Sequence, residues 1–230
     1  MNFAILAAGD GSRLAAGGID VPKPMVRLNG VALIDRLTDI LVRNGAESIS
    51  VIVNERNRQT VSFLQNKPFP VPLHLVVKST AGSMHSLYEL RGFLKDGDFC
   101  LMTVDTVFRE SEFAAYLQTF RDADEIDGLM AVTDFIDDEK PLYVETDEGM
   151  YITDFCDTRQ SGSRYVSGGI YCLRPAALQV LDDTMANGMT RMRDFQRQLI
   201  RHHLKLKAFA FSKIVDIDHP HDIETAENLI

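Results

Sequence analysis

The sequence predicts an α/β fold in which a mixed, mostly parallel sheet is flanked by helices. Residues 3–8 form a short apolar run without a charge, as expected for a strand buried on both faces at the centre of such a sheet. This run passes directly into a glycine-rich turn, the arrangement by which α/β proteins present backbone N–H groups to phosphates. Apolar runs and helical patterns then alternate along the chain. At 230 residues, we expect one domain over residues 1–230.

In the first half of the chain, strands and helices alternate. Residues 33–43 place Leu33, Leu37 and Leu41 on one face, which predicts an amphipathic helix that ends at Asn44 and Gly45. Residues 48–53 and 73–77 predict strands, and residues 54–66 between them predict a helix. Ser83 is suited to cap a helix over residues 83–94. A nearly all-apolar strand over residues 99–104 and a helix over residues 111–120 follow.

The second half of the chain contains more strands. Residues 128–133 predict a strand, and residues 142–147 and 150–155 predict a hairpin. Within the strand expected at residues 165–173, Gly168 and Gly169 indicate a bulge or the close approach of a ligand. Pro175 and Pro220 each suit the start of a helix, and residues 190–203 predict another. The last strands are expected at residues 206–211 and 214–217, and the acidic run at residues 134–139 is expected to be a solvated loop.

Composition excludes several classes of protein. The chain is 45% hydrophobic and 25% charged, as in ordinary globular proteins. Its formal net charge of −9 argues against a nucleic-acid-binding protein, which should carry a basic face. The three cysteines, Cys100, Cys156 and Cys172, lack metal-binding spacing and indicate reduced thiols in a cytoplasmic protein. No apolar run is long enough for a membrane span, so a membrane partner is not expected, and the sequence does not specify an oligomeric state.

The turn after the first strand predicts an anion-binding loop. Gly9 and Gly11 leave room for a ligand and permit a positive φ, while Arg13 and Lys23 add two positive charges nearby. The spacing does not match the P-loop, because neither glycine is followed by Gly-Lys at the required distance. It does not match the dinucleotide fingerprint either, because Leu14 stands where the third glycine belongs.

The string LAAGDGSRL, residues 6–14, followed by PKPM, residues 22–25, and GVALI, residues 30–34, is more specific. It resembles the signature of the sugar-1-phosphate nucleotidyltransferases, which make nucleotide-sugars from a nucleoside triphosphate and a sugar 1-phosphate. The resemblance implies a Rossmann-like, nucleotide-diphospho-sugar transferase fold. It further implies that the glycine loop wraps the triphosphate and that Arg13 and Lys23 hold phosphates and stabilise the departing pyrophosphate as catalytic residues. The nucleotide-binding residues that it implies are Leu6, Ala7, Ala8, Gly9, Gly11, Gly82 and Ser83.

Two acids at strand ends are candidate Mg²⁺ ligands. Asp105 follows the apolar strand at residues 99–104, and Asp218 follows the strand at residues 214–217. The carboxyl ends of buried parallel strands are where α/β proteins bind ligands, and an unpaired buried acid is costly. By resemblance, Asp105 matches the family's magnesium-binding acid, although Val104 replaces the usual glycine before it. Asp218 matches the second ligand within VDIDHPHDIETAE, residues 215–227. A zinc-like cluster of Asp218, His219 and His221 is disfavoured, because the residues are adjacent and a further ligand is missing.

The acceptor side is expected around residues 142–173. The segment YVSGGIYCL, residues 165–173, resembles the family's NxGIY segment, so Gly169 is a candidate acceptor-binding residue. The family's EKP lysine, which often contacts the sugar phosphate, is missing from FCDTR, residues 155–159. Arg159 and Arg164 are the candidates to replace it, and each has an alternative interpretation as a surface arginine in a Ser/Gly-rich loop.

The resemblance implies a Mg²⁺-dependent reaction in which an acceptor phosphate oxygen attacks the α-phosphate of a nucleoside triphosphate and pyrophosphate leaves. Such a step needs positioning and charge neutralisation rather than a general base. Three alternatives stay open: a cytidylyltransferase for a phosphorylated alcohol such as phosphocholine, a molybdenum-cofactor nucleotidyltransferase, and a catalytically silent nucleotide-sugar-binding protein. The match over residues 165–173 counts against the second alternative, and the missing lysine keeps the third open.

Overall fold

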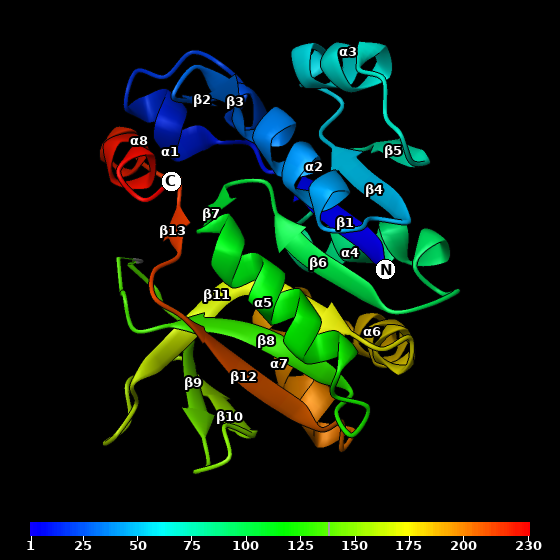
Figure 1. Cartoon of the computed structure of the whole chain (residues 1–230), viewed down its shortest axis with the longest axis vertical. Coiled ribbons are helices and arrows are strands. Elements are labelled where there is room, and N and C mark those ends of the chain that lie inside the picture. The colour runs from blue at the N-terminus through cyan, green and yellow to red at the C-terminus, as the bar shows by residue number, and fades with distance from the viewer. Residues whose placement is uncertain (138) are drawn as a thin grey trace.

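The central feature of the computed structural model, which describes residues 1–137 and 139–230, is one large mixed sheet (Figure 1). Among these residues the strands of the sheet are β1 (Asn2–Ala7), β4 (Ser48–Val53), β5 (Leu73–Val77), β6 (Phe99–Thr103), β8 (Gly128–Thr133), β9 (Tyr143–Thr146), β10 (Ile152–Cys156), β11 (Tyr165–Leu173) and β12 (Leu206–Phe211). Their order is β10-β9-β11-β6-β1-β4-β5, and β8 joins β12 to β11. The segment β6-β1-β4-β5 is parallel, as is the pair β8 and β12, whereas β11 runs antiparallel to its neighbours. The expected α/β class with a mixed sheet is confirmed.

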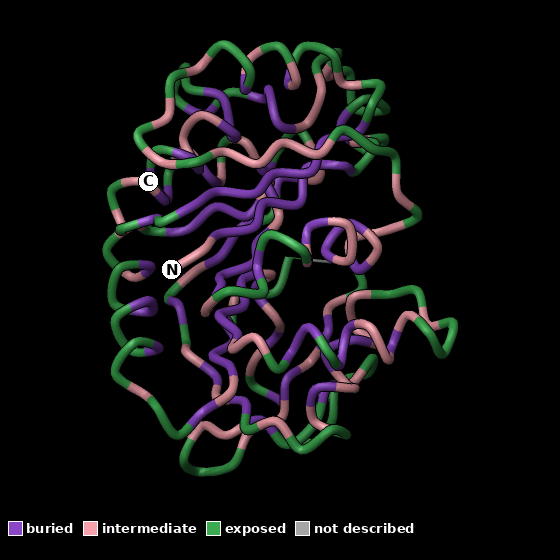
Figure 2. The backbone as a smooth tube through the Cα atoms, turned by 90° about the vertical axis from the view of Figure 1, so that its right-hand side faces the viewer, coloured by how far each residue is buried: buried purple, intermediate pink, exposed green. Residues whose placement is uncertain are grey.

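Helices cover both faces of the sheet. One apolar cluster packs under α2 (Leu33–Arg43), α3 (Arg58–Asn66), α5 (Glu110–Arg121) and α8 (Pro220–Glu227). The other packs under α4 (Ser83–Leu90), α6 (Ala176–Ala186) and α7 (Met192–Arg201). Successive side chains of a strand point to opposite faces, so Phe3 and Ile5 of β1 join the first cluster and Ala4 and Leu6 the second. The central strands are accordingly buried along most of their length (Figure 2).

Short elements near the site differ from the sequence-based expectation. The turn expected after the first strand passes into the helix α1 (Ser12–Ala16) and then into a 3-10 helix (Lys23–Met25). The small strands β2 (Arg27–Leu28) and β3 (Val31–Ala32) form a hairpin. Two further short strands, β7 (Thr106–Val107) and β13 (Val215–Asp216), pair with each other. The strand expected at residues 214–217 corresponds to β13. The other short elements, α1, β2, β3 and β7, carry little periodicity of their own, so the sequence pattern does not reveal them.

Ser83 is the first residue of α4 rather than its cap, because the capping position falls on Gly82 and no side-chain hydrogen bond caps the helix. The expected helix at residues 54–66 begins only at Arg58. Asn54 instead turns its buried amide toward the glycine loop, where Nδ2 donates to the Ala8 carbonyl at 3.2 Å and to Asp10 Oδ1 at 3.0 Å. This loop is therefore tied to the end of β4.

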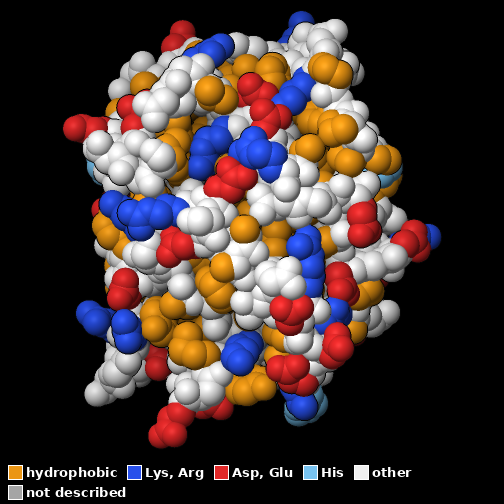
Figure 3. Space-filling view, viewed as in Figure 1, with side chains coloured by type: hydrophobic (Ala, Val, Ile, Leu, Met, Phe, Trp, Pro, Cys, Tyr) orange, Lys and Arg blue, Asp and Glu red, His pale blue; other side chains and the backbone are white. Residues whose placement is uncertain are grey.

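The surface carries acidic and basic side chains interspersed over the face seen in Figure 3. Among the described residues, none of the helices combines the length and the apolar character that crossing a membrane requires. The run at residues 134–139, expected to be a solvated loop, includes Asp138, which lies outside the described residues. Asp134, Asp137 and Glu139 of this run are exposed or partly exposed.

Candidate active site

A cavity of about 400 Å³ opens at the carboxyl ends of β1 and β6. The strands, the glycine loop (residues 8–13), the start of α4 and Asp218, which follows β13, all contribute to its wall. Every sequence-predicted nucleotide, catalytic and metal residue lines it: Leu6, Ala7, Ala8, Gly9, Gly11, Arg13, Lys23, Gly82, Ser83, Asp105 and Asp218. Thr80 and Ser86, which the sequence did not single out, line it as well and lie 2.7 Å apart through their hydroxyl oxygens.

Gly11 determines how closely the lysine segment can approach the loop. Its φ is +62°, a left-handed conformation that favours glycine. A Cβ at Gly11 would lie 3.2 Å from the Lys23 Cβ, closer than side chains ordinarily pack. Glycine at this position therefore lets the chain carrying Lys23 fold back against the loop.

Lys23 joins two acids that are far apart in the sequence. Its Nζ donates to Asp218 Oδ1 at 2.7 Å and pairs with the carboxylate of Asp105. The Ile217 amide donates to the Asp105 carbonyl at 3.1 Å, and this bond holds the two acidic segments together. The lysine side chain is 12% exposed. Burial alone lowers the pKa of Lys23, but Asp105 and Asp218 outweigh it and raise the pKa above its ordinary value, so the ammonium stays charged.

Further groups orient Asp218. The exposed Arg13 pairs with Asp218 Oδ2 at 2.9 Å. The buried carboxylate of Asp222 accepts hydrogen bonds from the backbone amides of Asp218 at 2.9 Å and His219 at 2.6 Å. An acid in the first turn of α8 that accepts hydrogen bonds from the two amides before the helix fixes the entry to the helix, and with it the backbone that carries the Asp218 side chain.

The acidic pair fits a divalent cation. Two carboxylates from adjacent strand ends converge on a single ammonium group, which shows that the geometry brings their negative charges to one point. Oxygen ligands from one or two carboxylates, completed by water and substrate phosphates, are what Mg²⁺ prefers. Asp105 and Asp218 are therefore the residues that would hold it.

A third acid, Asp216, lies beside this pair. Its Oδ1 accepts a hydrogen bond from Thr106 Oγ1 at 3.0 Å, and Thr106 and Thr103 are joined at 2.7 Å through their hydroxyls. Protein atoms around the carboxylate displace its hydrating water, and this desolvation, together with the charge of Asp105, raises the pKa of Asp216 to about 7. The side chain nevertheless opens onto cavity solvent, which screens it and weakens the effect of that shift on stability. The sequence pattern could have identified Asp216, because it is the one acid in an otherwise apolar predicted strand, residues 214–217.

A second cavity, of about 200 Å³, adjoins the first, since Leu6, Ser83 and Thr103 line both. Gly169, the predicted acceptor residue, lies in its wall at a φ of +74°, within an irregularity of β11 against β8. A Cβ at Gly168 would lie 2.3 Å from Ile214 Cδ1. The expected bulge or close approach at this Gly-Gly pair thus has a structural basis in the chain itself.

Arg159 and Arg164, the arginines proposed from the sequence for the acceptor, do not line either cavity. Arg159 Nε donates to the Ser163 carbonyl at 3.3 Å. Arg164 lies 3.7 Å from Asp134 and over the ring of its neighbour Tyr165. The cations that line the second cavity are Lys140 and Arg193. No local motif marks Arg193, which lies within a predicted amphipathic helix, so sequence patterns could not single it out.

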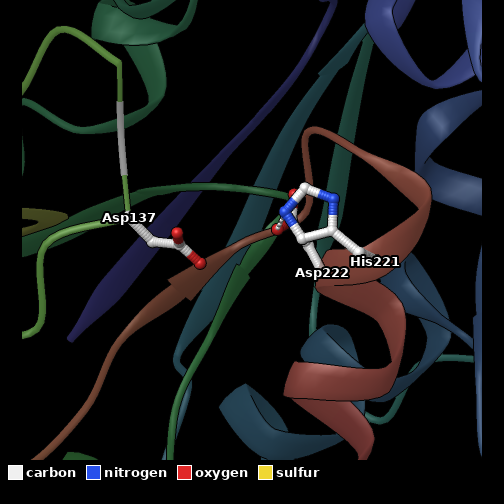
Figure 4. Close-up of side chains that lie close together, drawn as sticks. All are labelled: Asp137, His221 and Asp222. Atoms are coloured by element: carbon white, nitrogen blue, oxygen red, sulfur yellow. Dashed lines mark ion pairs between the residues drawn. The ribbon is translucent and has the colours of Figure 1, made fainter.

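Another acidic group lies apart from Lys23. Ligand atoms of Asp137, His221 and Asp222 fall within 4.8 Å of one another (Figure 4). His221 Nε2 lies 3.2 Å from Asp222 Oδ1, while Asp222 Oδ2 already accepts from the amides of Asp218 and His219, just before α8. The disfavoured cluster of Asp218, His219 and His221 is not among the groups of converging ligand atoms in the described chain.

Comparison with known proteins agrees with this geometry. The bifunctional protein GlmU of Methanococcus maripaludis is 24% identical over 99% of this chain, and the chain spans about half of GlmU, 54% of its length. The UTP–glucose-1-phosphate uridylyltransferase AglF of Haloferax volcanii is 26% identical over 99% of this chain and 95% of AglF. The structure of the inositol-1-phosphate CTP transferase from T. maritima has the same fold, with a TM-score of 0.83 at 22% identity over 99% of this chain and 94% of that one.

The nucleotidyl transferase family model matches residues 4–230, from the first strand through the glycine loop and both acids to the last helix. With a match of that extent over a fold shared with solved relatives, this chain belongs to the nucleotidyl transferase family.

Proposed function

We propose that this chain, as one domain over residues 1–230, transfers a nucleotidyl group from a nucleoside triphosphate to a sugar 1-phosphate in a Mg²⁺-dependent reaction. The products are a nucleotide-sugar and pyrophosphate. One observation carries the proposal: the Lys23 ammonium is held between Asp105 and Asp218 in the cavity that the glycine loop lines. This arrangement gathers cationic and metal-binding groups where a triphosphate would lie.

In the proposed step, an oxygen of the acceptor phosphate attacks the α-phosphorus of the triphosphate. A new P–O bond forms, the bond from the α-phosphorus to the bridging oxygen breaks, and pyrophosphate leaves with that electron pair. The acceptor phosphate is already ionised at neutral pH, so no proton has to be removed. Catalysis then rests on alignment and on neutralising the charge of the phosphates.

The residues of the first cavity have distinct roles in this step. Amides of the glycine loop bind the phosphates, and Arg13 and Lys23 stabilise the charge that builds up on the leaving pyrophosphate. When bound at Asp105 and Asp218, Mg²⁺ would supply further charge neutralisation between the phosphates. Because the lysine contacts both acids, it also holds them in place before the substrate arrives.

The lining of the second cavity favours a polyhydroxylated acceptor. It presents the hydroxyls of Thr103, Ser167 and Tyr171, the amide of Gln196 and the carboxylate of Asp216. Such groups exchange hydrogen bonds with sugar or cyclitol hydroxyls. A quaternary ammonium such as choline is bound best by several aromatic faces, and Tyr171 is the aromatic residue of this lining. A phosphorylated alcohol other than choline, transferred from CTP, is therefore the second candidate, and the inositol-1-phosphate CTP transferase of the same fold supports it.

The test is a pyrophosphate-release grid with Mg²⁺. ATP, CTP, GTP, UTP and dTTP are each combined with α-D-glucose 1-phosphate, N-acetyl-α-D-glucosamine 1-phosphate, α-D-mannose 1-phosphate, myo-inositol 1-phosphate and phosphocholine. We expect one triphosphate paired with a polyol phosphate to give the highest rate. A highest rate with phosphocholine would refute the acceptor class. Nucleotide binding without pyrophosphate release from any pair would favour a catalytically silent nucleotide-sugar-binding protein.

We also propose that the protein acts in the cytoplasm. Cys100, Cys156 and Cys172 are free thiols in the structure, which suits a reducing compartment.

A further inference from the structure

The second cavity is lined by an arginine, Arg193, to which no sequence motif gives a role. Arg193 lies in the first turn of α7, and it lines this cavity together with Gln196, three residues further along the same helix face. The segment that leads into α7 lies next to the first cavity, since a Cβ at Gly82, which lines that cavity, would lie 3.7 Å from the Thr190 carbonyl oxygen. Arg193 therefore lines the cavity that adjoins the first one, on a helix whose preceding segment lies beside Gly82.

Two contacts hold the Arg193 guanidinium in place. Its Nη1 pairs with Asp157 Oδ1, and its Nη2 donates to the Lys140 carbonyl at 3.1 Å. The side chain stays 27% exposed. Among the described residues, these two bonds use two of the five N–H donors of the Arg193 guanidinium. The planar group is therefore held in place and still has donors for a ligand.

Arg193 shares its carboxylate partner with a second arginine. Asp157 also pairs with Arg197 Nη2 at 2.8 Å, so one carboxylate faces two guanidinium groups. Hydrogen bonds from Arg193 and then from Arg197 lower the pKa of Asp157, which keeps the carboxylate ionised at neutral pH. Arg197 also lies 3.9 Å from Asp194, whereas Arg193 is the guanidinium of this group that lines the cavity.

Asp157 lies in residues 155–159, the segment that lacks the lysine expected for this family. Although this segment supplies no cation of its own to the cavity, its acid orients a cation from α7. Arg159, from the same segment, and Arg164 both lie outside the lining. The cation on this side is therefore Arg193, which comes from a helix and is positioned by its contact with Asp157.

We propose that Arg193 is the arginine that binds the acceptor substrate, oriented by Asp157 and the Lys140 carbonyl. This inference rests on the proposed function, because it assigns the second cavity to the acceptor. The fork donates to oxygen atoms of the acceptor, either those of its phosphate or those of its hydroxyls. Gln196 and Ser167, joined at 3.1 Å, form the neighbouring part of the same wall.

The test compares Arg193→Gln with Arg197→Gln. Both variants remove a guanidinium that pairs with Asp157, but only Arg193 lines the cavity. With the best substrate pair of the grid, we expect Arg193→Gln to raise the acceptor KM about tenfold or more and to leave the triphosphate KM within about twofold. Arg197→Gln should leave both values within about twofold, and Arg193→Lys should restore part of the loss. Equal effects of the two glutamine variants, or an unchanged acceptor KM in Arg193→Gln, would overturn the proposal.

Competitors identify the oxygen atoms involved. If Arg193 contacts the phosphate, Arg193→Gln weakens inhibition by inorganic phosphate. If it contacts hydroxyls, the variant weakens inhibition by the free polyol, D-glucose or myo-inositol. Loss of neither inhibition would overturn the assignment.

A binding measurement separates this inference from the proposed function. Calorimetric titration of the same acceptor phosphates, with a non-hydrolysable triphosphate present, gives a Kd without turnover. If wild-type protein binds an acceptor but releases no pyrophosphate, the proposed function fails, and Arg193 is judged by the Kd ratio of variant to wild type. If none of these acceptors binds to wild-type protein, both the function and the inference are refuted.

Discussion

Replacing Lys23 by methionine tests how the first cavity works. The substitution keeps most of the side-chain volume and removes the ammonium that contacts Asp105 and Asp218. At a separation of roughly 5 Å and an effective dielectric constant of about 20, two carboxylates repel each other by about 3 kcal/mol. Arg13 remains 2.9 Å from Asp218, and Asp218 is 26% exposed, so part of this repulsion is screened. We expect the free energy of unfolding to fall by about 1–3 kcal/mol.

The effect on turnover should be larger than the effect on stability. A preorganised donor at developing negative charge contributes about 3–4 kcal/mol to the transition state, so Lys23→Met should lower kcat about 10²-fold or more. We expect Asp105→Ala to lower it to a similar extent while the fold persists. Pyrophosphate release at saturating Mg²⁺ measures the change in kcat, and urea unfolding measures stability.

Lys67 provides a matched control. Its Nζ lies 2.5 Å from both Asp35 and Asp39, and its side chain is 15% exposed, yet it does not line either cavity of the site. Lys67→Met should therefore lose comparable stability and keep its kcat. A kcat of Lys23→Met within about twofold of that of Lys67→Met would refute the assigned role of Lys23.

The same variant reports on the metal site. Without the ammonium, Asp105 has lost its counter-charge and Asp218 keeps Arg13 alone, so a divalent cation can supply the missing positive charge. We expect Mn²⁺ or Mg²⁺ to raise the Tm of Lys23→Met more than that of wild-type protein. An equal rise in both proteins would contradict the placement of the cation at these two acids.

Three further changes test other parts of the structure. Gly169 has a φ of +74°, and a Cβ there would lie 3.2 Å from Thr106 Oγ1, so Gly169→Ala should lower the free energy of unfolding by about 1–3 kcal/mol in a urea melt and raise the acceptor KM. Gly162 has a φ of +101° but lies in open space, so Gly162→Ala should change stability alone. The buried Tyr116 hydroxyl bonds two backbone groups, at 2.5 Å and 2.7 Å, so Tyr116→Phe should cost about 1–3 kcal/mol while kcat is kept, and unaltered stability would count against these bonds. For Asp216, whose pKa rises from 3.8 to about 7, the folded protein keeps a proton that the unfolded chain releases, so wild-type stability falls as pH rises through this window. In urea melts, the free energy of unfolding of Asp216→Asn relative to that of wild-type protein should be higher at about pH 8 than at about pH 5. A difference between the two proteins that does not change with pH would disprove the pKa shift.

Much of the fold could be read from the sequence. The helix at Leu33–Arg43 and the strands Ser48–Val53, Leu73–Val77, Gly128–Thr133, Tyr165–Leu173 and Leu206–Phe211 occur at the expected residues. Each is long enough for hydrophobic periodicity to define it, and turn residues mark its ends. The placement of Asp105 at the carboxyl edge of the parallel strands also followed from the sequence, whereas Asp218 reaches the same cavity because β13 pairs with β7, directly after Asp105.

Only the tertiary structure decided which charges face each cavity. Sequence patterns suggested Arg159 and Arg164 for the acceptor side, whereas Arg193 and Lys140 line the cavity, and Arg193 is held by a carboxylate 36 residues away. The contact of Lys23 with Asp218 spans 195 residues. Local propensity acts over a few residues and specifies helices, strands and turns. Contacts over such separations depend on how those elements pack, which a local pattern does not encode.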